Sequence, residues 1–297
     1  MEKQNVGGPA VTEGVMMQSK KYRAIAVRKS NGEIELKKEK ISSWVHDKKI
    51  DKIPFLRGGF VLFETMIQGM KSLNYSSEFF MEDDEEEDAI DRFLKRLFKD
   101  KANEAIMAVS LIIAMILSVG LFVLIPTTIS GLFSKIIKNN IALNLIEGLI
   151  RISILILYML AISKNEDIKR TFMYHGAEHK VIYCYENDLE LTVDNARTFG
   201  TLHPRCGTNF LFLVMATSII LFSFFGWPNI LVRFAMRILC IPIVAGISYE
   251  IIKFLGKYDN ILSKIVAYPG MMLQHITTNE PDDEQLEVAI KALKAVI

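Results

Sequence analysis

Cysteine is scarce in this sequence, with three residues in 297. They are Cys184, Cys206 and Cys240, and such a sparse, odd set argues against the disulfide framework of a small secreted protein. Excess charge is equally absent, because 35 lysines and arginines stand against 34 aspartates and glutamates. A nucleic-acid-binding domain needs a strongly basic surface. The net charge of +1 therefore predicts no nucleic-acid partner.

A signal peptide and an internal repeat are also missing. Residues 1–13 lack the apolar core of a secretory signal, so we expect the N-terminus to stay in the cytoplasm. What the sequence does contain is apolar blocks separated by charged segments. Hydrophobic residues make up 51% of the chain, and the mean hydropathy is +0.25. This pattern excludes a disordered chain and a simple soluble enzyme, and it predicts a membrane protein with sizeable polar parts.

Four apolar stretches approach the roughly 20 residues that a helix needs to cross a bilayer: residues 105–125, 141–162, 210–227 and 230–252. Pro126 is expected to end the first stretch. Lysine and arginine gather before the first stretch, after the second and after the fourth, and such residues favour the cytoplasmic side. The sequence predicts a multi-pass protein of the bacterial inner membrane with both termini in the cytoplasm.

Two ionisable residues interrupt the second stretch. Glu147 and Arg151 are four residues apart, so they share one helix face and can form an ion pair. Ionisable groups inside a membrane span often serve function, but a structural pair near the outer interface explains them equally well. Both interpretations stay open at this point.

The predicted fold is a mainly α membrane protein with four transmembrane helices and a cytoplasmic α+β portion. That portion combines a small N-terminal β-hairpin with amphipathic helices. The expected division of the chain is a cytoplasmic α+β segment at 1–80, a charged linker at 81–103, a transmembrane hairpin at 104–162, a histidine-rich cytoplasmic loop at 163–209, a second transmembrane hairpin at 210–255 and amphipathic C-terminal helices at 256–297.

The N-terminal polar segment contains three patterns. Residues 23–36 alternate apolar and polar positions around Asn31-Gly32, which predicts a hairpin with a type I′ turn. Residues 60–74 have helical period and are too short to span comfortably, so they predict a helix at the membrane interface or packed on the bundle. Residues 7–17 are rich in glycine and apolar residues but not periodic, and they lack the Gly-Lys-Ser/Thr end of a P-loop.

The remaining polar segments predict linkers and docking helices. Seven consecutive acids at 82–88 are typical of a solvated linker, with calcium capture as the alternative. Residues 259–276 are amphipathic, with an expected break at Pro269-Gly270. A final helix is expected to begin at Pro281 and to dock on the cytoplasmic portion through one apolar stripe.

The histidine-rich loop carries the clearest chemical pattern, H-x-x-E-H at His175, Glu178 and His179. Two histidines four apart share one helix face, so their ring nitrogens can reach one metal ion. A glutamate beside them can act as general base on a metal-activated water. The pattern inverts H-E-x-x-H and matches the inverzincin motif. Glu186 falls seven residues after His179 and hence near the same face.

Further candidate ligands begin at His203, 24 residues after His179, in the run from His203 to Thr208. His203 and Cys206 are three residues apart, and a cysteine thiolate is a good zinc ligand. Three of the five histidines thus lie within one polar loop. We predict His175, His179, His203 and Cys206 as ligands of a divalent metal, with zinc preferred, and Glu178 as the catalytic residue. A hydrogen-bonded structural cluster is the alternative.

Five segments together resemble the YqhQ-like family of uncharacterised bacterial multi-pass membrane proteins: residues 7–17, Arg57-Gly58, 174–180, 203–208 and 269–274. Members of that family are labelled predicted metal-dependent enzymes, so the resemblance implies such an activity here without naming a substrate or a ligand set. Its motifs include the five predicted site residues, and also Glu13 and Arg57. The last two imply that the glycine-rich N-terminal segment folds against the histidine-rich loop.

Three functions are therefore compatible with the sequence. The first is an integral membrane protein with a cytoplasmic metal site, acting as a metal-dependent hydrolase and contacting membrane lipid. The second is a non-enzymatic scaffold or assembly factor that binds a protein partner at the cytoplasmic face and uses the histidines structurally. The third is a small transporter that uses Glu147, Arg151 and Glu250, for which four spans suffice only if the chain forms an oligomer.

Overall fold

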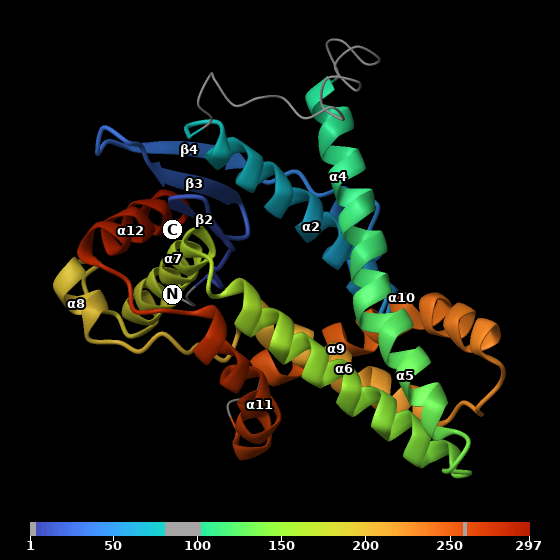
Figure 1. Cartoon of the computed structure of the whole chain (residues 1–297). Coiled ribbons are helices and arrows are strands. Elements are labelled where there is room, and N and C mark those ends of the chain that lie inside the picture. Colours follow the sequence, from blue (N-terminus) through green and yellow to red (C-terminus); the bar gives the residue numbers. More distant parts are fainter. Residues whose placement is uncertain (1–3, 81–101, 258–259) are drawn as a thin grey trace. The chain divides into compact units, whose positions relative to one another are not determined.

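The computed structural model describes residues 4–80, 102–257 and 260–297, which are mainly helical with one small sheet (Figure 1). Residues 81–101, which hold the seven acids and nearly all of the predicted linker, lie outside the described part. The chain divides into two compact units. The first comprises Met1–Phe80, Ile156–Ser218 and Cys240–Ile297, and the second comprises Met81–Leu155 and Ile219–Leu239.

The sheet belongs to the first unit and has four antiparallel strands in sequence order. They are β1 (Ala10–Val11), β2 (Gly14–Gln18), β3 (Tyr22–Arg28) and β4 (Ile34–Lys40). The predicted hairpin is confirmed as β3 and β4, which pair from Tyr22↔Lys40 to Arg28↔Ile34. The predicted sheet was too small, because β1 and β2 were not expected.

Burial on both faces explains why apolar and polar residues do not alternate along β2. Val15 and Met17 point into a core with helices α7 (Glu166–Glu186) and α12 (Asp283–Val296). Met16 points the other way, into a cluster that also contains Tyr75 of helix α2 (Leu56–Ser77). A strand covered on both faces is apolar at every position rather than alternating.

The hairpin turn differs from the predicted type I′. Such a turn needs positive φ at both central residues, but only Gly32, with φ 85°, is left-handed there. The Gly32 N–H donates to the Lys29 carbonyl at 2.9 Å, and the Lys29 N–H donates to the Glu33 carbonyl at 2.9 Å. The loop is therefore one residue longer than predicted, with glycine taking the left-handed position before β4.

Helix α12 completes the core of the first unit, as its apolar stripe predicts. Leu286, Ala289 and Leu293 are buried in the same cluster as the inner faces of α7 and β2. The helix begins two residues later than expected, at Asp283, because Asp282 is its N-cap and forms a capping box with Gln285. Pro281 thus precedes the cap instead of opening the helix.

The remaining described helices are α1 (Trp44–Asp47), a 3₁₀ turn at Ile50–Lys52, α4 (Ala102–Val119), α5 (Ile125–Phe133), α6 (Asn140–Ile162), α8 (Val193–Arg197), α9 (Gly207–Ser223), α10 (Ile230–Lys257) and α11 (Ile261–Thr277). Within the described residues, three helical stretches are long and apolar enough to cross a membrane: Ala108–Phe133, Asn140–Ile162 and Ile230–Leu255. Helix α9 is apolar but has 17 residues. A mainly helical protein with three candidate spans is therefore established.

Two prolines that the sequence predicts to end or break a helix do not do so. Pro126 sits in the first turn of α5, and a π-helical turn at Gly120–Leu124 joins α4 to α5 without a break. Proline has no N–H to donate to the Phe122 carbonyl one turn earlier, and that carbonyl accepts from Arg151 Nε at 2.8 Å instead. Pro269 likewise lies inside the continuous helix α11. Helix α2, with 22 residues, is also longer than predicted.

The second unit contains the predicted pair of Glu147 and Arg151, whose Oε1 and Nη2 atoms lie 3.0 Å apart. The same carboxylate also accepts hydrogen bonds from Arg237 of α10, at 2.5 and 2.7 Å, and from Thr127 of α5, at 3.1 Å. Glu147 is 1% exposed. The interaction is thus a buried network linking three helices, larger than the single pair that the sequence predicts.

Candidate metal centre

Helix α7 presents the H-x-x-E-H residues from the middle of its length. It begins at the N-cap Asn165, whose side chain accepts from two backbone N–H groups of the first turn. Tyr174 and Ala177 point into the core beside the sheet. His175, Glu178 and His179 follow the adjacent face and line a cavity. The helical spacing that predicts a shared face for these residues is confirmed.

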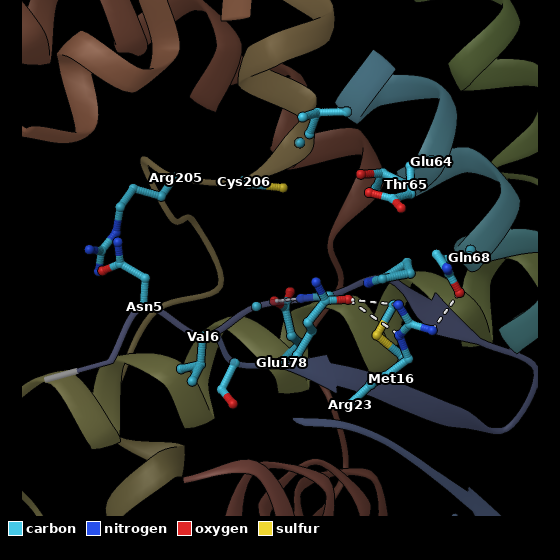
Figure 2. Close-up of a pocket in the computed structure, with 18 of the residues that line it drawn as sticks. Asn5, Val6, Met16, Arg23, Glu64, Thr65, Gln68, Glu178, Arg205 and Cys206 are labelled. Carbon is cyan, nitrogen blue, oxygen red and sulfur yellow. Dashed lines mark hydrogen bonds between the residues drawn. The ribbon is translucent and has the colours of Figure 1, made fainter. Parts of the chain in front are cut away.

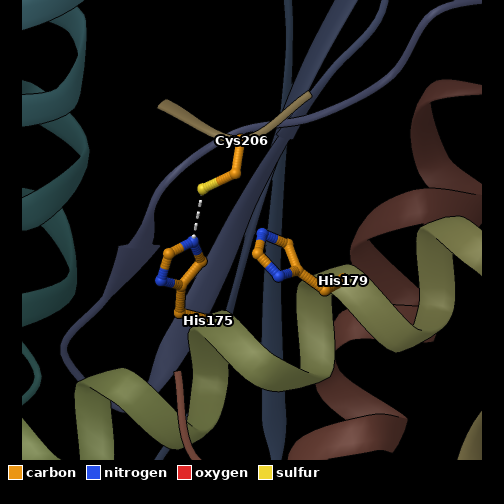
Figure 3. A group of neighbouring side chains, drawn as sticks. All are labelled: His175, His179 and Cys206. Atoms are coloured by element: carbon orange, nitrogen blue, oxygen red, sulfur yellow. Dashed lines mark hydrogen bonds between the residues drawn. The ribbon is translucent and has the colours of Figure 1, made fainter. Parts of the chain in front are cut away.

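Cys206 joins the two histidines from the segment that directly precedes helix α9 (Figure 3). One ligand atom from each of His175, His179 and Cys206 can be chosen so that all three lie within 4.8 Å of one another. The His175 Nε2 atom is 3.1 Å from the Cys206 sulfur, and the two imidazole centroids are 4.5 Å apart. Two imidazoles and a thiol therefore converge on one point.

Backbone carbonyls fix the orientation of both imidazoles. His175 Nδ1 lies 2.8 Å from the Thr277 carbonyl oxygen, and His179 Nδ1 contacts the Thr201 carbonyl oxygen. Because a carbonyl only accepts, each Nδ1 carries the proton and each Nε2 presents its lone pair. Metal-binding histidines usually have this outer hydrogen bond, which sets their tautomer and ring orientation.

The Nε2 atom of His179 is buried and has no hydrogen-bond partner among the described residues. Burial lowers the pKa of His179 below its ordinary value, although the neighbouring Cys206 thiol opposes the shift, so the neutral imidazole persists to lower pH. A buried lone pair without a partner is costly, and a cation at this position would satisfy it.

Glu178 lies beside the three side chains. Its Oε2 atom is 3.6 Å from His179 Nε2 and 4.0 Å from His175 Nε2. Its Oε1 atom accepts the Gly8 N–H at 3.2 Å. Burial raises the pKa of Glu178, and His175, the Gly8 N–H and His203 oppose that shift. One carboxylate oxygen is thus held by the N-terminal segment while the other faces the cluster.

His203, the fourth predicted ligand, is placed outside the cluster. Its Nδ1 accepts the Arg205 N–H at 3.3 Å, so the proton sits on Nε2, which faces Glu186 Oε2 at 3.5 Å. The His203 ring lies near that of His179, with centroids 5.5 Å apart, but both of its nitrogens have other partners. The spacing in the sequence correctly predicts that His203 lies near His179, but it does not determine where the His203 nitrogens point.

Gln274 of α11 holds the His203 backbone and is a site residue that sequence reasoning missed. It is fully buried. Its Oε1 accepts the His203 N–H at 2.7 Å, and its Nε2 donates to the His203 carbonyl at 2.8 Å. The only sequence signal was its position at the end of the 269–274 motif. The carbonyls of Thr201 and Thr277 carry no signal, because any residue supplies a carbonyl.

The expected fold of the N-terminal segment against the histidine-rich region is confirmed through Glu13. The Glu13 carboxylate accepts hydrogen bonds from Arg170 and, at 3.2 Å, from the Tyr174 hydroxyl, both on α7. Arg57 does not take part, because it pairs with Glu250 of α10. Glu13, together with Gly8, therefore links the glycine-rich segment to the helix that carries the cluster.

A cavity of about 910 Å³ opens beside the cluster (Figure 2). All the residues that line it belong to the first unit. The walls are formed by residues 5–10, parts of β2 and β3, one face of α2, and the region from α7 to the start of α9. Pockets of this size accommodate small molecules, so there is room for a ligand next to the cluster of His175, His179 and Cys206.

Comparison of the sequence with known proteins identifies a family. A family model described as a protein of unknown function (DUF1385) matches residues 53–297. The chain belongs to this family. It is also 36% identical over 299 residues to "Uncharacterized protein YqhQ" of Bacillus subtilis (strain 168), an alignment that covers 98% of this chain and 92% of the relative. No solved structure matches. The resemblance predicted from the five motifs is thus confirmed for the DUF1385 chain.

Proposed function

We propose that this DUF1385 protein is a membrane-anchored, metal-dependent hydrolase with a single zinc site formed by His175, His179 and Cys206. The observation that carries the proposal is the convergence of these three side chains while both Nδ1 atoms are held by carbonyls. A purely structural histidine cluster would satisfy both nitrogens of each ring, whereas His179 Nε2 has no hydrogen-bond partner among the described residues.

The donor set suits zinc better than the harder divalent cations. Imidazole and thiolate are soft or borderline ligands, whereas calcium and magnesium prefer oxygen. Catalytic zinc sites typically have three protein ligands and one open position. Cys206 also directly precedes α9, and the N-terminus of a helix favours a negative charge such as a thiolate.

In this proposal Glu178 is the proton carrier. When bound, zinc acts as a Lewis acid and lowers the pKa of a coordinated water. Glu178 Oε2, which faces the cluster, would accept a proton from a water held there and would return it to the leaving group. The raised pKa of Glu178, caused by burial, brings the carboxylate closer to the range in which a group both accepts and releases a proton near neutral pH.

We further propose four transmembrane crossings, with α9 as the fourth. The support is that the chain must cross the membrane an even number of times between two elements that lie on the same side. Helix α12 shares one core with α7 and β2, so these elements lie on the same side of the membrane. Among the described residues from α7 to α12, one stretch is long and apolar enough to be a candidate span, and it lies in α10. A single crossing would separate α7 from α12, so if α10 crosses the membrane a second helix must cross with it, and we assign that crossing to α9.

Lysine and arginine next to the spans suggest that the shared side is the cytoplasm. The groups after α6 and after α10 flank the elements of this core. The metal cluster, which lies in the same unit, is then at the cytoplasmic face, and both termini are cytoplasmic. A bacterial inner membrane is the location that fits this orientation.

Metal analysis of the purified full chain tests the proposal. We expect about one zinc per chain in the wild type and a loss of most of it in His175→Ala, His179→Ala and Cys206→Ser, because each removes one of three ligands. Glu178→Gln should retain zinc, since the proposed role of Glu178 is proton transfer.

His203→Gln is the matched control, because both nitrogens of His203 have partners outside the cluster. Its zinc content should equal that of the wild type. Equal metal content in the wild type, His175→Ala and His179→Ala would overturn the proposal and favour a structural role for the histidines. Loss of zinc in His203→Gln alone, with His175→Ala unaffected, would also contradict this ligand set.

A further inference from the structure

An almost buried arginine lies in the wall of the same cavity. Arg23 of β3 is 9% exposed and lies in the cavity wall near Gln68 of α2 (Figure 2). Gln18 of β2 also lines the cavity. The Nε and Nη2 atoms of Arg23 donate to Gln18 Oε1 at 3.3 and 3.2 Å, and its Nη1 donates to Gln68 Oε1. Two neutral amides therefore hold the guanidinium in place.

Among the residues that the structure describes, the charge of Arg23 has no direct counter-ion. Over residues 4–80, 102–257 and 260–297, no carboxylate lies within ion-pair distance of its guanidinium. Glu39 and Glu64 act on it only from farther away, and they offset part of the effect of burial. Glu64 is itself engaged, because its carboxylate accepts from the Ser43 hydroxyl at 2.7 Å and from the Trp44 N–H at 3.0 Å.

A buried arginine that is held by neutral amides is suited to binding an oxyanion. Burying a cation without a paired anion is unfavourable, and the planar fork of a guanidinium matches the oxygens of a phosphate. Three of the five N–H groups of Arg23 are used by the two glutamines, so two remain for a ligand. The amides fix the orientation of the fork without neutralising its charge.

Apolar surface lies next to the polar part of the cavity. Met66 of α2 lines the cavity and is 41% exposed, and Phe60 and Phe63 on the same helix are 41% and 49% exposed. Gly207 and Thr208, at the start of the apolar helix α9, also line it. A ligand with a phosphate at Arg23 would therefore find the Met66 side chain in the same cavity.

We propose that the cavity binds a phosphate-bearing molecule through Arg23, with Gln18 and Gln68 as positioning residues. Phospholipid headgroups and soluble phosphate esters share this chemistry. The inference rests on the proposed function only for the reaction that the bound molecule undergoes at the zinc site. Phosphate binding by Arg23 itself requires no metal, so the two proposals can fail separately.

The test is a binding measurement on the purified full chain in detergent, by calorimetry at fixed ionic strength. The probes are dihexanoyl phosphatidylglycerol, as a soluble lipid, and glycerol 3-phosphate. We expect saturable binding of at least one probe, weakened by about tenfold to a hundredfold in Arg23→Gln, because a charge-assisted hydrogen-bond pair is lost. Tighter binding of the lipid would identify a headgroup as the source, and tighter binding of glycerol 3-phosphate would identify a soluble ester.

A second variant separates lost binding from misfolding. Gln68→Glu keeps the size of the side chain but places a carboxylate against the guanidinium, so it should also weaken binding at least tenfold. Arg197→Gln is the control, since Arg197 is half exposed, pairs with Asp283 and lies outside the cavity. The inference is overturned if neither probe binds, or if Gln68→Glu binds as the wild type does.

Zinc content measured in the same samples distinguishes this inference from the proposed function. Arg23→Gln and Gln68→Glu should retain zinc, because neither residue belongs to the metal cluster. Arg23-dependent phosphate binding in a wild type that takes up no zinc would support the phosphate site and remove the hydrolase proposal. Full zinc content without Arg23-dependent binding would do the reverse.

Discussion

Buried imidazoles control how the folded protein responds to acid. Burial lowers the pKa of His179 and of His203 below the value of 6.5 that they have in an unfolded chain. Below pH 6.5 the unfolded state therefore binds protons that the folded state rejects, and the free energy of unfolding falls as the pH drops. Each histidine can contribute up to about 1.4 kcal/mol per pH unit in this range.

We therefore expect the metal-free protein, kept in a chelator, to lose thermal stability between pH 7.5 and pH 5.5. His179→Gln combined with His203→Gln should flatten this dependence, and His275→Gln, which changes an exposed histidine, should not. Glu178 acts in the opposite direction. Its raised pKa lets the folded state take up a proton above pH 4.5 that the unfolded state does not, so Glu178→Gln should steepen the loss. A melting temperature independent of pH in the wild type would refute this account.

Gly176 packs closely against the segment that orients one of the proposed metal ligands, His175. A Cβ at this position of α7 would clash with the backbone carbonyl of Asn279, which is held close because its N–H donates to the Phe172 carbonyl at 2.9 Å. Gly176→Ala must push this segment away, and with it the neighbouring Thr277 carbonyl that orients His175. We expect a loss of about 1–3 kcal/mol in stability and weaker zinc binding.

Denaturant unfolding and metal titration of the same preparation check this prediction. Gly200→Ala is the matched control, because a Cβ there meets no atom within 4 Å. The variant Gly200→Ala should unfold and bind zinc as the wild type does. If Gly176→Ala behaves like Gly200→Ala, α7 and the Asn279 segment are not in the close contact described.

Among the elements, α6, α5 and α10 are joined through the single carboxylate of Glu147. Replacing it by glutamine leaves Arg151 and Arg237 buried without this counter-charge, and removing one partner of a buried pair typically costs about 3–5 kcal/mol. Glu147→Gln should therefore lower the melting temperature strongly. Adding Arg237→Gln should recover part of the loss, because it removes one of the unpaired charges.

Glu166→Gln, which changes an exposed acid in the first turn of α7, should have little effect and serves as control in the same thermal assay. A transporter that depends on the charge of Glu147 would instead lose flux while keeping its stability. Unchanged stability in Glu147→Gln would thus contradict the structural role and revive the transporter hypothesis.

The elements predicted correctly from sequence are those whose pattern is local. The spacing of His175 and His179 predicts the helical face of α7, and the apolar stripe predicts the docking of α12. Strand β2 was missed because both of its faces are covered. Pro126 was misjudged because Arg151 donates to the Phe122 carbonyl in place of the N–H that proline lacks, a tertiary contact without its own sequence signal.

The site was predictable in residue type but not in orientation. His175, His179 and Cys206 were identified from motif and spacing. The position of the His203 nitrogens away from these three side chains depends on contacts with Arg205 and Glu186 and on the hydrogen bonds of Gln274 to the His203 backbone. Such contacts join residues up to 71 positions apart, and no single sequence specifies them. Arg23 was not identified for the same reason, since its role comes from two glutamines on different elements.

At the scale of the whole molecule, the core shared by β2, α7 and α12 constrains how the chain crosses the membrane. Four single cysteines test the four-span proposal against a two-span alternative: Lys138→Cys between α5 and α6, Gly226→Cys between α9 and α10, Asp194→Cys in α8, and Glu284→Cys in α12. The three native cysteines are buried and should react slowly with an impermeant maleimide.

In intact spheroplasts we expect labelling at positions 138 and 226, and labelling at 194 and 284 only after permeabilisation. If position 226 behaves like position 194 while 138 is labelled from outside, α9 and α10 do not cross the membrane, and two spans remain. The number of crossings between α7 and α12 is still even in that case. Opposite behaviour of 194 and 284 would be the more serious result. A membrane cannot separate two helices that are packed in one core, so the shared core of α7 and α12 would itself be wrong.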